Sequence, residues 1–169
     1  MAAGSTYTPI ATTTLGSAAA SYTFSSIVGT YTDLVLVASV QTPSNDNTDI
    51  CIQFNSDTGN NYSRTYLLGD GTSAISGNTA NSGRIAAPSI SGNSVNSGVF
   101  TPVIFNIQNY SNSTTYKTVL ARTANAKGYE GATVGLWRST SAITSLLIFP
   151  NAGTLNTGST FTLYGIAAA

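Results

Sequence analysis

Six carboxylate side chains are the residues of this chain best suited to catalysis. Two of them facing each other across a bound sugar would be enough for glycoside hydrolysis, one as the acid and one as the base or nucleophile. They are Asp33, Asp46, Asp49, Asp57, Asp70 and Glu130. Five of the six lie in or beside segments rich in turn-forming residues, where Asp commonly stabilises a turn by bonding to its own backbone. Turn formation is therefore the interpretation of these carboxylates, and hydrolysis by a facing pair is the alternative hypothesis.

Histidine is absent from the chain. Its absence removes the commonest general base near neutral pH, together with the Ser–His and Cys–His nucleophile pairs and most zinc sites. The single cysteine, Cys51, lies in the stretch DICIQF with no cationic neighbour to lower its pKa, so we expect a packed, unreactive thiol. We predict that the protein is not an enzyme and has no catalytic residue.

Two segments that contain Asp weakly resemble calcium-binding loops. SNDNTD, at 44–49, holds Asp46 and Asp49, and NSDTGNN, at 55–61, holds Asp57. Neither has the number of carboxylates or the closing Glu that such a loop needs. We interpret both as turns and expect Asp46 and Asp57 to tolerate replacement by Ala. No metal and no cofactor is predicted.

Nine tyrosines and one tryptophan, Trp137, supply the aromatic surface. Tyrosine beside Asn and Ser is typical of surfaces that bind sugars or proteins. Four tyrosines fall at expected strand ends or in loops, where a binding rim would lie, and are candidate contacts with a partner or a glycan: Tyr62, Tyr110, Tyr116 and Tyr129. The alternative is that these rings cover sandwich edges and subunit contacts, with only the hydroxyl in water. Trp137 is expected in the core or in an interface.

The composition favours strands, because Thr, Val, Ile, Tyr and Phe are frequent while Leu, Glu, Lys, Gln and Arg are sparse. Ten strands are predicted, at 6–15, 21–27, 32–41, 48–55, 62–68, 99–109, 116–124, 132–138, 142–149 and 159–166. Asp70-Gly71 is the one strong two-residue turn signal. The short link STS at 139–141 predicts a hairpin between the strands on either side. Residues 73–98 are expected to form a long Gly-, Ser- and Asn-rich loop, either functional or merely a surface loop.

Ten short strands with no helix to cover a sheet leave two packed sheets or one closed barrel. We predict a single all-β domain over 1–169, a two-sheet antiparallel β-sandwich that is jelly-roll-like and has about ten strands. TDLVLVASVQ, at 32–41, and SLLIFP, at 145–150, are apolar on both faces. Strands have this pattern when one face meets the core and the other meets a neighbouring chain. The pattern therefore favours an oligomer.

Charge is scarce: 6 basic and 6 acidic residues give a formal net charge of zero, and only 7% of residues are charged. Without a basic patch, the chain lacks the electrostatic footprint of a protein that binds nucleic acid or an anionic membrane. The start, MAAGSTYTPI, has neither the basic nor the apolar region of a signal peptide, and no segment approaches the roughly 18 apolar residues of a membrane span. We predict no nucleic-acid partner and no membrane partner.

Four segments, taken together and in order, resemble a family of small virion proteins of tailed bacteriophages, many of them phages of cyanobacteria. They are SIVGTYTDLVLVASV, ICIQFNSDTGNNYSRTYLLGDGTSA, GLWRSTSAITSLLIF and GSTFTLYGI. The resemblance runs from about Tyr7 to the C-terminus. It implies a β-sandwich carried on the virion. It carries over no catalytic residue and names no binding residue.

The resemblance leaves two virion roles open. The first is a trimeric cement, or decoration, protein on the outer capsid surface, which stabilises the DNA-filled shell by bridging subunits of the major capsid protein. The alternative is the distal receptor-binding module of a tail fibre or tailspike that recognises a host surface glycan. Predicted strands from residue 6 to residue 166 leave no stem, which favours the capsid. We expect a homotrimer that is made in the host cytoplasm and carried on the virion.

Overall fold

The computed structural model describes residues 6–43, 47–90, 92 and 98–167. In this part of the chain there are twelve β-strands and no helix. The strands are β1 (Tyr7–Thr14), β2 (Tyr22–Phe24), β3 (Asp33–Val40), β4 (Thr48–Phe54), β5 (Tyr62–Gly69), β6 (Ala74–Ser82), β7 (Ile85–Ile90), β8 (Thr101–Ile107), β9 (Lys117–Ala124), β10 (Glu130–Trp137), β11 (Leu146–Pro150) and β12 (Thr160–Ile166). The prediction of an all-β fold is confirmed.

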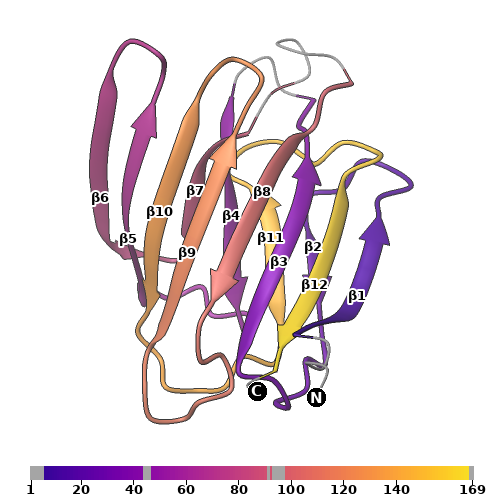
Figure 1. Cartoon of the computed structure of the whole chain (residues 1–169), viewed down its shortest axis with the longest axis vertical. Coiled ribbons are helices and arrows are strands. Elements are labelled where there is room, and N and C mark those ends of the chain that lie inside the picture. The colour runs from indigo at the N-terminus through magenta and orange to yellow at the C-terminus, as the bar shows by residue number, and fades with distance from the viewer. Residues whose placement is uncertain (1–5, 44–46, 91, 93–97, 168–169) are drawn as a thin grey trace.

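The strands form two antiparallel sheets that lie face to face, with the large sheet in front of the small sheet in Figure 1. The large sheet has eight strands in the order β1-β12-β3-β8-β9-β10-β5-β6, and the small sheet has four in the order β2-β11-β4-β7. From β1 to β5 the chain changes sheet at every strand, and it visits the small sheet again at β7 and β11. This repeated crossing gives the sandwich its jelly-roll-like winding.

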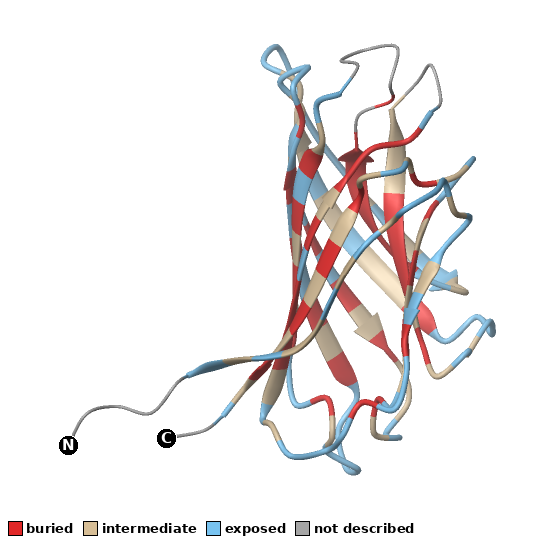
Figure 2. Cartoon of the chain, turned by 90° about the vertical axis from the view of Figure 1, so that its right-hand side faces the viewer, coloured by how far each residue is buried: buried red, intermediate tan, exposed pale blue. Residues whose placement is uncertain are grey.

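The core lies between the two sheets and is filled, in most strands, by alternate residues. In β3, Leu34, Leu36 and Ala38 point toward the small sheet and are buried, whereas Val37 points the other way. Figure 2 shows this alternation of buried and more exposed residues along the strands. Each fully buried aliphatic or aromatic side chain contributes about 1.5–3 kcal/mol relative to its exposed state. Successive side chains of β3 therefore alternate between the core and the opposite face of the sheet.

Ten of the twelve strands lie where the sequence predicts them, with ends that differ by a few residues. The two additional strands, β6 and β7, lie in the segment 73–98 that was expected to be a loop. β6 (AISGNTANS) has no apolar alternation of its own and is held by pairing with β5 across the Asp70-Gly71 turn. β7 (IAAPSI) is made mainly of small residues, and all six of its residues are buried. Of the expected loop, residues 91 and 93–97 lie outside the described residues.

The hairpin predicted at the STS link is wrong. β10 belongs to the large sheet, between β9 and β5, whereas β11 belongs to the small sheet, between β2 and β4. The link therefore crosses from one sheet to the other. Asn55 stabilises the crossing, because its Oδ1 accepts the backbone N–H of Thr144 at 2.8 Å and its Nδ2 donates to the carbonyl of Ala142 at 2.8 Å.

Candidate functional site

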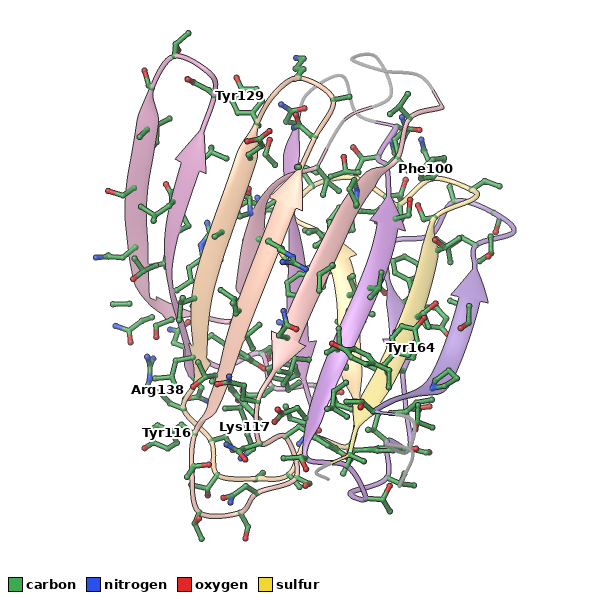
Figure 3. All side chains as sticks on the ribbon, viewed as in Figure 1. Phe100, Tyr116, Lys117, Tyr129, Arg138 and Tyr164 are labelled. Atoms are coloured by element: carbon green, nitrogen blue, oxygen red, sulfur yellow. The ribbon has the colours of Figure 1, made fainter. Side chains whose placement is uncertain are left out.

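The large sheet has an outer face, which we define as the side chains that point away from the small sheet. The strand register places Tyr164, Val35, Asn106, Leu120 and Val134 side by side in one row across β12, β3, β8, β9 and β10. Figure 1 is viewed onto this face, and Tyr164 is labelled on it in Figure 3. The row crosses the centre of the widest surface of the molecule.

Large apolar side chains on the outer face remain exposed in the single chain. Leu67, Leu120 and Val134 are 64%, 48% and 54% exposed, and Val37 and Tyr7 on the same face are also exposed. Single exposed apolar residues are normal, but rows of them on neighbouring strands form a patch of the kind that marks an interaction site. The outer face is therefore the surface best suited to contact with another protein.

Charged side chains are few on this face. Among the described residues, the strands of the large sheet direct Asp33, Arg122 and Glu130 outward. Arg122 lies between Ile104 and Ala132 in the register, and its guanidinium has no hydrogen-bond or ion-pair partner in the described part of the chain. The low charge reduces the cost of removing water from the face, and the unpaired Arg122 is available to a carboxylate of another chain.

A hollow of about 530 Å³ lies at the end of the large sheet formed by β5, β6 and β10. Leu67, Ala132 and Glu130 line it, together with Ile75 of β6. The hollow is continuous with the apolar surface around Leu67. It gives the outer face a depression beside Leu67.

The four candidate tyrosines divide into two buried and two accessible residues. Tyr62 and Tyr110 have no exposed surface, and burial raises the pKa of both hydroxyls. The hydroxyl of Tyr62 accepts the backbone N–H of Phe54 at 2.9 Å, which identifies it as a core residue. Tyr116 is 53% exposed, and Tyr129 is partly exposed at the turn between β9 and β10. Figure 3 places Tyr116 and Tyr129 toward opposite ends of the molecule.

The carboxylates are dispersed, and Asp49 and Asp57 have different side-chain partners. Asp49 forms a salt bridge with Arg64 at 3.0 Å, and Asp57 accepts the indole N–H of Trp137 at 2.7 Å. The other described carboxylates lie at separate turns and strand ends, namely Asp33, Asp70 and Glu130. Asp46 lies outside the described residues. That the protein is not an enzyme remains a prediction.

Lys117 is a buried cation with only carbonyl partners. Its Nζ donates to the backbone carbonyls of Asn112 at 2.6 Å, Thr115 at 2.8 Å and Thr140 at 3.3 Å. Burial lowers the pKa of this ammonium group. The three bonds tie the β8–β9 loop to the segment that crosses between the sheets. Lys117 therefore has a structural role at the end of the sandwich near Tyr116 (Figure 3).

Cys51 has no exposed surface, and burial raises the pKa of its thiol to about 12. The thiol is therefore neutral at physiological pH, and the prediction of a packed cysteine is confirmed. In the part of the chain that the structure describes, no group of three or more His, Cys, Asp or Glu side chains could hold a metal ion. No helix there is long and apolar enough to span a bilayer.

Comparisons with known proteins do not assign the chain to a family. No protein-family model matches the chain, and no curated protein matches it. Among solved structures, the whole chain aligns with 82% of a protein of unknown function from Shewanella oneidensis MR-1 at 9% sequence identity. The TM-score of that alignment is 0.23, too low to carry any conclusion about fold or function.

Proposed function

We propose that the protein is a trimeric cement protein on the outer surface of a phage capsid, where it bridges subunits of the major capsid protein. The observation that carries this proposal is the outer face of the large sheet, which is broad, apolar and nearly uncharged. The ordered resemblance of four sequence segments to virion proteins supplies the setting.

The occupants that we propose for the outer face are further copies of the same chain. Leu120 and Val134 supply apolar area at the centre of the face, as the cores of permanent homo-oligomer interfaces do. Arg122 and Glu130 bring opposite charges to the same face. A copy related by rotation can place its Glu130 against Arg122 of its neighbour without leaving either charge unpaired.

A trimer built in this way presents three equivalent turns or edges to the shell. Each contact with a capsid subunit needs only modest affinity. Once one chain of the trimer is bound, the other two chains are held at a high effective concentration near their own capsid sites. The bridge adds contacts that must break before neighbouring capsid subunits can separate. Outward load from packed DNA is then shared over many such bridges.

The proposal is tested with particles assembled without the protein and then incubated with the purified chain. We expect cryo-electron microscopy to find sandwich-sized density at the junctions between capsomers, and the treated particles to release DNA at a higher temperature than the untreated ones. Density only at the distal end of the tail would refute the proposal and support the alternative role in receptor binding. Treated and untreated particles that open at the same temperature would also contradict it.

A further inference from the structure

The two sheets of the described chain end in four edge strands, namely β1 and β6 in the large sheet and β2 and β7 in the small sheet. Proteins keep other chains from adding a strand to such an edge by making it short, by placing proline or charge on it, or by bulging it. β2 is only three residues long. β1 contains Pro9, which has no backbone N–H, and a bulge between Pro9 and Ala11. These two edges are therefore protected.

The edge of β7 is protected by side chains of the large sheet. The carbonyl of Ala86 accepts a bond from Nη1 of Arg64 at 2.7 Å and one from Oγ1 of Thr133 at 3.3 Å. The carbonyl of Pro88 accepts a bond from Oγ1 of Thr123, and Pro88 has no N–H to donate. These backbone groups are therefore not available to another strand.

The fourth edge strand, β6, has none of these protections over most of its length. It lies at the left of Figure 1 and is the longest described strand, with nine residues. Its sequence, AISGNTANS, contains no proline and no charged residue. Only the end near Ser82 is modified, by a bulge in the pairing with β5 and by Arg138, which donates to the carbonyl of Ala80 at 3.0 Å. The first part of β6, residues 74–79, is an open edge.

The turn between β5 and β6 determines which backbone groups of this edge point outward. The N–H of Asp70 donates to the carbonyl of Ser73 at 3.2 Å. From such a closing bond, hydrogen-bonded and non-hydrogen-bonded pairs alternate along an antiparallel ladder. No described strand lies beyond β6. The residues of β6 that direct N–H and C=O away from β5 are therefore Ala74, Ser76 and Asn78.

A second copy of β6 fits this edge in antiparallel orientation. With Ser76 on a twofold axis, Ser76 faces Ser76 of the other copy, and Ala74 faces Asn78. In this register each of the three outward-directed residues has a partner with which it exchanges N–H···O bonds. Because the strand has no charged residue, no like charges meet across the contact.

The side chains are complementary in the same register. Ile75, which is 42% exposed, lies opposite Gly77 of the other copy. A Cβ at Gly77 would lie 2.7 Å from the hydroxyl oxygen of Tyr66, so the Tyr66 ring lies across this glycine. Arg64 holds the ring, with its Cζ 5.1 Å from the ring centroid. Ile75 of one copy therefore meets Tyr66 of the other across a residue that has no side chain, and the twofold axis repeats this contact.

We infer that β6 is a second self-association site, at which two copies join their large sheets by antiparallel pairing of residues 74–78. The contact uses the backbone of the sheet edge and not the central row of the outer face, so it is independent of the proposed trimer. A contact between two strands is weak in dilute solution. On a capsid, chains held side by side have a high effective concentration, and the pairing links neighbouring trimers there. That last role rests on the proposed function, whereas the pairing itself does not.

Disulfide cross-linking of the purified chain tests the pairing and its register. Cys51 has no exposed surface, so an introduced cysteine is the reactive thiol. Ser76→Cys places two thiols at the axis, with a Cα separation of about 5.5 Å that suits a disulfide. Asn78→Cys is the matched control, because residue 78 is also exposed and directed outward but lies about 14 Å along the strands from its copy.

Oxidised glutathione is the oxidant, and the protein is at submillimolar concentration. We expect Ser76→Cys to form disulfide-linked dimers about tenfold faster than Asn78→Cys, because pairing raises the effective concentration of the two thiols at residue 76. Non-reducing electrophoresis measures both rates. Equal rates, or faster cross-linking of Asn78→Cys, would overturn the inference.

Two further variants separate strand pairing from other contacts. Asn78→Pro, added to Ser76→Cys, removes an outward N–H without removing a bond to β5, so we expect a folded chain by circular dichroism and the slow cross-linking of the control. Fast cross-linking of this folded variant would refute backbone pairing. Val134→Glu, added to both cysteine variants, removes the proposed outer-face contact and is expected to keep the tenfold ratio. Loss of the ratio would show that the cross-link forms within the trimer and would refute a separate edge contact, whereas failure of the trimer alone leaves the ratio unchanged.

Discussion

At the scale of single residues, Asp57 shows how one carboxylate can serve both a turn and the core. It accepts the backbone N–H of Gly59 at 2.9 Å, as a turn residue does, and also the indole N–H of the buried Trp137 at 2.7 Å. Trp137 packs against Phe54 and Tyr62, with ring centroids 5.4 Å and 6.1 Å away. The expectation that Asp57 tolerates replacement by Ala must therefore be revised.

We predict that Asp57→Ala lowers the free energy of unfolding by about 1–3 kcal/mol, because it leaves the indole N–H of Trp137 without its acceptor. Asp70→Ala is the control, since Asp70 accepts the N–H groups of Thr72 and Ser73 in a similar turn but has no buried partner. Urea unfolding measures both variants. Equal losses of unfolding free energy in the two variants would show that the hydrogen bond from Trp137 to Asp57 does not stabilise the fold.

The same contacts give the Asp57 effect a pH dependence. Burial alone would raise the pKa of Asp57, but the hydrogen bonds from Trp137, Asn61 and Gly59 outweigh it and lower the pKa below its usual value. The carboxylate therefore stabilises the fold above its unfolded pKa of about 3.9, and this stabilisation is lost as pH falls through the folded pKa. We expect the difference in stability between wild type and Asp57→Ala to shrink below about pH 4.

At the scale of the elements, the sequence predicts strands well and their pairing poorly. An apolar run locates β3 in the sequence and apolar–polar alternation locates β12, but neither pattern holds information on which strands become neighbours. β6 and β7 were missed because their residues are small or polar, and because burial of β7 depends on the strand that it packs against. That strand is β10, whose Gly131 and Gly135 lie directly beneath Pro88 and Ile85.

We predict that Gly135→Ala destabilises the protein by about 1–3 kcal/mol, because a Cβ at this position would lie 2.6 Å from Cγ2 of Ile85 and force the two sheets apart. Gly16→Ala is the matched control, since nothing lies within 4 Å of a Cβ placed there. That substitution is expected to be neutral or slightly stabilising. Thermal unfolding compares the two, and a Gly135→Ala variant as stable as Gly16→Ala would contradict this account of the sheet contact.

At the scale of the whole molecule, the sequence predicted part of the candidate surface. The two-faced apolar pattern of β3 pointed to a partner on its outer side, where Val37 is exposed. The contribution of β9 could not be predicted, because each of its faces mixes apolar and polar residues: Leu120 and Arg122 point outward, and Ala121 and Thr123 point inward. Only the packing of the two sheets decides which of these faces is covered.

The trimer prediction depends on that packing. It can be tested by placing one carboxylate on the outer face and, in a control variant, one carboxylate outside it. Val134 and Val28 are almost equally exposed, at 54% and 55%, but Val134 lies in the central row of the outer face and Val28 lies in the loop before β3. We expect wild type and Val28→Glu to have three times the chain mass by light scattering at micromolar concentration, and Val134→Glu to be a folded monomer, because burial of an unpaired carboxylate costs several kcal/mol. A wild-type monomer would refute the trimer. A trimer that survives Val134→Glu would show that the copies meet through another surface, and the outer face would then be free to contact the capsid itself.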